Sequence, residues 1–167
     1  MSITQATVSH CSQNRLDKEA TISVNINKEF NTATHNLKIT VSGLTSEHFN
    51  LKNPTLSIFI TEDSLISYQN GGGSKYRHDH VIREVVTQTW GDSLIFSSGA
   101  YSKDYTIEVP ETWKYNNVRI IAFVANYNSK DKNDCSVENA NITSLLSDNT
   151  SGIDCINNTD QDLYDIF

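Results

Sequence analysis

TLSIFIT, residues 55–61, places Leu56, Ile58 and Ile60 on one side of an extended chain and Phe59 on the other. Successive side chains of a β-strand point to opposite faces, so a period of two indicates a strand. Three aliphatic side chains on one face, with an aromatic side chain opposite them, indicate that both faces are covered. The stretch therefore predicts a well-buried strand.

The same period of two recurs on both sides of this strand. Residues 21–27 and 37–42 alternate apolar and polar side chains, and the polar connector 28–36 predicts that they pair antiparallel. Residues 105–110 predict a half-buried strand that ends at a proline. Residues 118–125, VRIIAFVA, are apolar on both faces after Arg119, which favours a central strand.

Two further segments complete the predicted fold. Residues 3–10 predict a first strand, and residues 137–146 a last one, whose apolar phase shifts between Val137 and Ala140 and indicates a β-bulge. No amphipathic helical pattern exceeds about two turns. The sequence thus predicts an all-β, two-sheet antiparallel β-sandwich, immunoglobulin-like or jelly-roll-like, with seven or eight strands. The side chains expected in its core are Ile22, Val24, Ile26, Leu37, Ile39, Val41, Leu56, Ile58, Ile60, Ile107, Val109, Ile120, Ala122 and Val124.

Residues 62–92 hold the densest cluster of polar and aromatic side chains in the chain. Residues 70–74, NGGGS, predict a loop. Residues 76–86 predict one extended strand, with His78, His80 and Ile82 on one face, and 90–92 a turn. The candidate binding or structural residues of this cluster are Glu62, Tyr76, His78, His80, Arg83, Trp90 and Asp92.

The order of these residues resembles a known family. Glu62-Asp63, the Gly71–Gly73 run, the Tyr76-x-His-x-His-Val-x-Arg83 pattern and Trp90-Gly-Asp are similar to the 28-kDa-outer-membrane-protein-related family of Bacteroidetes. Further similarity continues to about Leu145. The resemblance implies a β-sandwich module of a cell-envelope protein, associated with the outer membrane, at the cell surface or secreted. It implies no catalytic activity.

Charge and length divide the chain into two predicted parts. Residues 1–146 form the sandwich domain, and residues 147–167 an acidic polar linker or tail. Residues 133–167 carry seven acids and no Lys or Arg, which accounts for the whole net charge of −7. The final LYDIF, 163–167, resembles the opening strand of a C-terminal sorting domain, and an apolar end that docks on the sandwich is the alternative.

Several classes of protein are excluded or disfavoured. The chain has no basic stripe for nucleic acid or anionic membranes, and no apolar run near the ~18 residues of a membrane span. No nucleophile elbow, phosphate loop or dinucleotide fingerprint is present. Residues 1–4, MSIT, do not begin a signal peptide, so we interpret the chain as a fragment that starts after its targeting signal.

His78 and His80 are the strongest candidates for metal ligands. Two His at i and i+2 of a strand face the same side, but zinc needs at least three protein ligands. A third ligand would come from His10, His35, His48 or Glu62, and no second motif selects one. Hydrogen bonding of the two His to loop carbonyls is the alternative. We expect no metal and no cofactor. Cys11, Cys135 and Cys155 leave the pairing of any disulfide open.

We therefore expect the cluster to be a structural network. Glu62 and Arg83 should form a buried ion pair with two parallel hydrogen bonds, covered by Trp90. The expected function is a non-catalytic module for interaction or spacing, whose partners are other domains of the same precursor or envelope proteins, with carbohydrate or a host protein as further options. The alternative is a metal-dependent hydrolase, or a metal-dependent carbohydrate-binding module, that uses His78 and His80.

Overall fold

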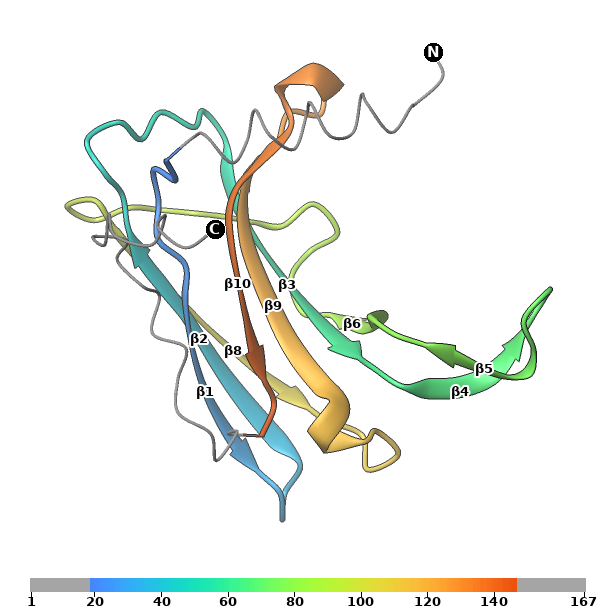
Figure 1. Ribbon diagram of the computed structural model, residues 1–167. Coiled ribbons are helices and arrows are strands. Elements are labelled where there is room, and N and C mark those ends of the chain that lie inside the picture. The colour runs from blue at the N-terminus through green and yellow to red at the C-terminus, as the bar shows by residue number, and fades with distance from the viewer. Residues whose placement is uncertain (1–18, 147–167) are drawn as a thin grey trace, which may run out of the picture.

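The computed structural model of the chain describes residues 19–146, and these residues form a β-sandwich with a projecting two-stranded arm (Figure 1). The strands are β1 Asn25–Asn31, β2 Asn36–Leu44, β3 Pro54–Glu62, β4 Leu65–Gln69, β5 Gly73–His78, β6 Val81–Val85, β7 Asp92–Ser93, β8 Ala100–Glu108, β9 Val118–Asn126 and β10 Ser136–Ser144, with short 3₁₀ turns at Tyr115–Asn117 and Lys132–Asp134. No helix in this part of the chain is long and apolar enough to span a membrane.

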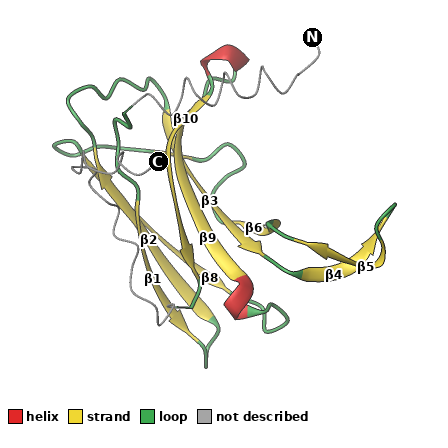
Figure 2. Cartoon of the chain, viewed as in Figure 1, coloured by secondary structure: helices red, strands yellow, loops and turns green. Residues whose placement is uncertain are grey.

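The strands are arranged in two main sheets, and every pairing is antiparallel. One sheet has the order β1-β2-β8, and the other has the order β10-β9-β3-β6. The short strand β7 also pairs with β3, at the Thr55 end, while β6 pairs with β3 at the Glu62 end. The third pairing, β4 with β5, continues away from the sandwich beyond the ends of β3 and β6 (Figure 2). The two main sheets form the all-β antiparallel sandwich that the sequence predicts.

The core lies between the two main sheets, where the sequence alternation places it. The expected core side chains of β2, β3 and β9 are all buried, as are Ile22, Val24 and Val109. Only Ile26 and Ile107 are partly exposed and pack against the margin of the core. Burying an aliphatic side chain contributes roughly 1.5–3 kcal/mol, so these inward faces supply much of the stability of the sandwich.

The main departure from the expected topology lies between residues 76 and 86. The single strand expected there is two strands, because Asp79 and His80 interrupt it and His80 has a φ of 56°. The two parts, β5 and β6, belong to different sheets. Together with the unexpected strand β4 and the short β7, this break gives the described residues ten strands rather than seven or eight.

The seam between the two sheets is closed by side-chain amides of β10. Asn139 Nδ2 donates to the Ile22 carbonyl at 2.7 Å, and Asn141 Nδ2 donates to the Val24 carbonyl at 2.8 Å. The predicted bulge of the last strand is confirmed, since the register of β10 shifts between Val137 and Asn139. The strand expected at residues 3–10 and the expected tail lie outside the described residues.

Gly43 lets the segment before β1 pass close over β2. A Cβ at this position would collide with the carbonyl oxygen of Ser23 and lie 2.6 Å from the Tyr101 ring. That same carbonyl accepts a hydrogen bond from the Tyr101 hydroxyl at 2.9 Å. Added side-chain volume at Gly43 would therefore push the segment off the sheet.

Gly43→Ala is expected to lower the free energy of unfolding by about 1–3 kcal/mol, because backbone must move to accept the methyl group. Urea denaturation followed by circular dichroism measures the loss. Ser102→Ala, at an exposed position of the neighbouring strand β8, is the matched control and should unfold like the wild type. An unchanged midpoint for Gly43→Ala would show that the close approach is not needed.

Candidate functional site

A buried carboxylate marks the point where the chain leaves the central part of the sandwich. The Glu62 side chain, at the end of β3, is 1% exposed. Its Oε1 accepts a hydrogen bond from the Lys114 N–H at 3.0 Å, and its Oε2 lies 3.4 Å from Arg83 Nε. The predicted ion pair is present, but it is not bidentate, and Oε2 has no hydrogen-bond partner among residues 19–146.

Trp113, rather than Trp90, covers this ion pair. The Arg83 guanidinium carbon lies 5.1 Å from the centre of the Trp113 ring, within the range of a cation–π contact. Trp113 is buried, with 8% of its surface exposed. It lies in a turn in which its backbone N–H donates to the Pro110 carbonyl. The corner between β8 and β9 thus supplies both the aromatic cover and, through Lys114, the backbone donor.

Immediately beyond Glu62, four residues form a reciprocal clamp at the base of the arm. Ser64 and His80 both have positive φ, at 60° and 56°. The chain therefore turns both where it enters the arm and where it leaves it. The Ser64 N–H donates to Asp79 Oδ1 at 2.8 Å, and the His80 N–H donates to Asp63 Oδ1 at 2.7 Å. Asp79, the residue before His80, thus holds the amide of Ser64, and Asp63, the residue before Ser64, holds the amide of His80.

Further side-chain contacts reinforce the clamp, which we define as Asp63, Ser64, Asp79 and His80. His80 Nδ1 lies 3.0 Å from Asp63, and Arg77 Nε lies 3.0 Å from Asp79. The Ser64 N–H, with the Arg77 guanidinium beside it, holds the pKa of the Asp79 carboxyl below its ordinary value. The charged form of Asp79 is therefore the form that fits the clamp.

The arm itself, β4 and β5 with their Gly-rich turn, presents large apolar side chains to solvent. Ile66, Tyr68 and Tyr76 are 57%, 70% and 45% exposed. Ile66 pairs with Arg77 and Ser67 with Tyr76, so both faces of the arm carry an apolar side chain. Isolated two-stranded hairpins are marginal in water, which makes the clamp important for the arm.

His78 and His80 do not form the site expected for them. The break at His80 separates them, and His80 bonds to Asp63 rather than to a loop carbonyl. His78 packs edge-on against Tyr76, with ring centres 4.9 Å apart, and its buried Nε2 has no hydrogen-bond partner in the described part of the chain. Within residues 19–146, no three His, Cys, Asp or Glu side chains are grouped so that they could hold a metal ion.

At the other end of β3, Asp92 and Gly91 fix a loop over the outer face of the sheet. Asp92 Oδ2 accepts a hydrogen bond from the Tyr105 hydroxyl at 2.8 Å, across from the other sheet. Burial, and then the Asp92 carboxylate, raise the pKa of Tyr105, so its hydroxyl remains a donor. Gly91 has a φ of 83°, and a Cβ there would lie 2.9 Å from both Ser57 Oγ and Thr55 Cβ.

This loop holds Trp90 above an aromatic trough that the sequence did not predict. The Trp90 ring is 64% exposed and stacks on Tyr127, with ring centres 5.1 Å apart and planes 10° apart. Phe59 and Phe123 meet edge-to-face at 5.3 Å in the same trough, whose volume is about 360 Å³. Trp90 was expected to pack against the ion pair, so that prediction is wrong.

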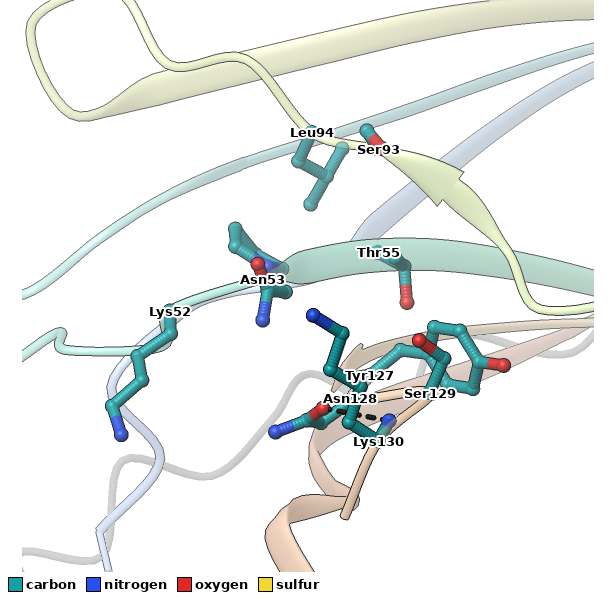
Figure 3. Close-up of a pocket in the computed structure, with 10 residues that line it drawn as sticks. Lys52, Asn53, Thr55, Ser93, Leu94, Tyr127, Asn128, Ser129 and Lys130 are labelled. Atoms are coloured by element: carbon teal, nitrogen blue, oxygen red, sulfur yellow. Dashed lines mark hydrogen bonds between the residues drawn. The ribbon is translucent and has the colours of Figure 1, made fainter. Parts of the chain in front are cut away.

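A polar hollow of about 590 Å³ adjoins the trough, since Thr55 and Tyr127 line both. Figure 3 shows the Asn53 amide, the Thr55 hydroxyl and the Lys130 ammonium pointing toward one space. Its wall is the turn after β9, where Asn128 Nδ2 donates to Asp134 Oδ2 at 2.9 Å. Hollow and trough together form one groove, which we call the outer groove.

The model of one protein family, described as Outer membrane protein Omp28, matches residues 1–145. The chain belongs to the Omp28 family. Among solved structures it is similar to HBP35 of Porphyromonas gingivalis, with 21% identity and a TM-score of 0.71 over 84% of this chain and 46% of that one. It is also similar to a domain of the outer membrane lipoprotein Omp28 from Porphyromonas gingivalis, with 22% identity and a TM-score of 0.55 over 76% of this chain and 89% of that one. No curated protein matches.

Membership of the Omp28 family confirms the resemblance found in the sequence and extends it to residues before 55. It places the protein in the cell envelope, in association with the outer membrane. At 21–22% identity, the two solved structures support the fold. The chain spans less than half the length of HBP35.

Sequence reasoning located one of the two regions that the fold builds. Glu62 and Arg83 lie together, as their spacing indicated, whereas the arm and the turn at His80 were not predicted. The outer groove was missed because its residues come from four strands, β3, β7, β9 and β10, and from four connecting loops. The one signal for it in the sequence is Trp90 beside Gly91, an aromatic residue next to a tight turn.

Arg83→Ala is expected to lower the free energy of unfolding by about 3–5 kcal/mol, because it leaves the Glu62 carboxylate buried without its counter-charge. Chemical denaturation measures the loss. The control is Arg119→Ala, which removes a 42% exposed side chain lying 3.6 Å from Asp63 and should cost less than about 1 kcal/mol. Equal losses in the two variants would refute a special role for the buried pair.

The clamp is expected to weaken in acid. Because the pKa of Asp79 is lowered in the folded protein, the contribution of its carboxylate is present above the ordinary value of 3.8. It is lost as the pH falls through the lower, folded value. The amide proton shift of Ser64 should report this transition by NMR, with a midpoint below 3.8 in the wild type and no such transition in Asp79→Asn. A midpoint at or above 3.8 would contradict the assigned hydrogen bond.

Proposed function

We propose that this Omp28-family chain is a non-catalytic interaction module of an outer-membrane-associated envelope protein, at the cell surface or secreted, and that it engages its partner through the β4–β5 arm. The observation that carries the proposal is the exposure of Ile66, Tyr68 and Tyr76 on one projecting element. Large exposed apolar side chains gathered on one element are characteristic of a binding surface.

The geometry of the arm supports a protein partner. Tyrosine combines a large apolar ring with a hydroxyl, which suits an interface that is dry at its centre and wet at its rim. Lys75 on β5 adds positive charge to a chain whose net charge is −7, whereas the charge of Arg77 is paired with Asp79. The outer edges of β4 and β5 pair with no other described strand, so they can also accept backbone hydrogen bonds.

The clamp supports the same function by reducing the entropic cost of binding. A hairpin on a flexible tether loses conformational freedom when it docks, whereas one with a fixed base has already lost much of it. Two hydrogen bonds from the turned amides to the carboxylates hold the base of the arm. The Arg77 guanidinium and the His80 ring add one contact each to the same two carboxylates. We infer that the partner is another domain of the same precursor or a second envelope protein.

The metal-dependent alternative has less support. His78 and His80 are separated by the turn at the base of the arm, and His80 is engaged by Asp63. Among the described residues, no other His, Cys, Asp or Glu side chain lies where it would complete a metal site with them. Titration of the untagged protein with zinc tests this alternative directly, and stoichiometric binding that His78→Ala abolishes would favour it over the interaction module.

Photo-crosslinking in the full-length protein in its native envelope tests the arm. A photoreactive phenylalanine replaces Tyr68 in the arm or, as the matched control, Ile95, which is 87% exposed outside it. Position 68 should give a discrete crosslinked product, and its mass distinguishes a domain of the same protein from a second protein. Position 95 should give none. Absence of a product at position 68, or the same products at both positions, would overturn the proposal.

A further inference from the structure

The outer groove lies at the end of β3 opposite to the arm, and it combines two kinds of surface. One half is aromatic, formed by Trp90, Tyr127, Phe59 and Phe123. The other half is polar. Since the two halves share Thr55, a ligand longer than one ring can contact both. The volume of each half lies in the range of small-molecule sites.

The polar half is positively charged. It contains Lys52 and Lys130, and none of the acidic residues between 19 and 146 lines it, although the chain as a whole carries a charge of −7. Neither ammonium lies within ion-pair distance of a carboxylate of another described residue. The lining also holds the side chains of Asn53, Ser93 and Ser129, for which the described residues provide no hydrogen-bond partner.

We propose that the outer groove binds an acidic oligosaccharide. A sugar ring lies against the exposed face of Trp90, neighbouring hydroxyl groups bond to the amide of Asn53 and the hydroxyls of Ser93 and Ser129, and the acidic group lies between Lys52 and Lys130. The indole presents a flat apolar face, and amides and hydroxyls both donate and accept, which matches the alternating surface of a sugar. This site is separate from the arm and goes beyond the proposed function.

The form of the groove favours a glycan over a peptide. Its floor is the outer face of the sheet formed by β3 and β9, whose backbone groups are already paired with neighbouring strands. The edge strands β7 and β10 lie at the sides of the groove, so an extended peptide laid on the floor itself would find no unpaired backbone groups in β3 or β9. A ring that stacks and bonds through its substituents needs only side chains, and these are what the groove presents.

The position of Trp90 over the groove depends on the neighbouring Gly91. Its loop reaches the sheet only because Gly91 accepts a φ of 83° directly above Thr55 and Ser57. Tyr127 supports the inner face of the indole and leaves the outer face open to solvent. A residue held in this way, with its ring supported from behind, is preorganised for stacking.

The test is a glycan array that displays uronic-acid, sialylated, sulfated and phosphorylated glycans beside their neutral counterparts. The strongest binder is then titrated against tryptophan fluorescence, which reports on the site because the chain has only exposed Trp90 and buried Trp113. We expect retention of acidic glycans only, with a change in the Trp90 emission. Trp90→Ala should weaken binding about tenfold or more.

Two further variants keep the result interpretable. Lys52→Gln/Lys130→Gln should weaken binding about fivefold in low salt and abolish its salt dependence, because screening acts on the charge contact alone. Tyr68→Ser, in the arm, should bind glycan like the wild type, so failure of the arm proposal and failure of this one are distinguishable. The proposal is overturned if no acidic glycan is retained, if neutral glycans bind equally well, or if Trp90→Ala binds unchanged while its denaturation midpoint equals that of the wild type.

Discussion

The burial of the Glu62 carboxylate is the constraint on which the rest of this structure depends. Glu62 ends the most buried strand of the sandwich, and its charge must be compensated locally, because an unpaired charge in an apolar core is very costly. Arg83 and the Lys114 N–H supply that compensation from two other segments. The end of β3, the β8–β9 corner and the middle of β6 are thereby fixed relative to one another.

The arm depends on this anchored point. Beyond Glu62 the chain can leave the sheet in many directions, and the left-handed residues Ser64 and His80 select one of them. Residues other than glycine adopt this conformation at some cost, which the crossed hydrogen bonds of Asp63 and Asp79 offset. The buried Glu62–Arg83 pair is therefore linked to the direction of the arm, which carries Tyr68 and Ile66.

Periodicity predicted the sandwich well because core packing enforces it. In β2, β3 and β9 every second side chain must be apolar, and that pattern is legible without coordinates. The division between β5 and β6 was not predictable in this way, because His-Asp-His continues an extended pattern until tertiary hydrogen bonds turn it. Likewise, Trp90 and Trp113 look equivalent in the sequence, and only the fold decides that one is exposed and the other covers Arg83.

One strand thus has a different surface at each end, the outer groove near Thr55 and the arm beyond Glu62. The central claim is that the clamp fixes the arm to the sandwich, and residual dipolar couplings test it most directly. In the wild type, amide couplings from β4 and β5 should fit the alignment tensor obtained from β3 and β9. In Asp63→Ala/Asp79→Ala, which removes both acceptor carboxylates, the couplings of the arm should shrink while those of the sandwich persist. Arm couplings already averaged in the wild type, or unchanged in the double variant, would contradict the claim.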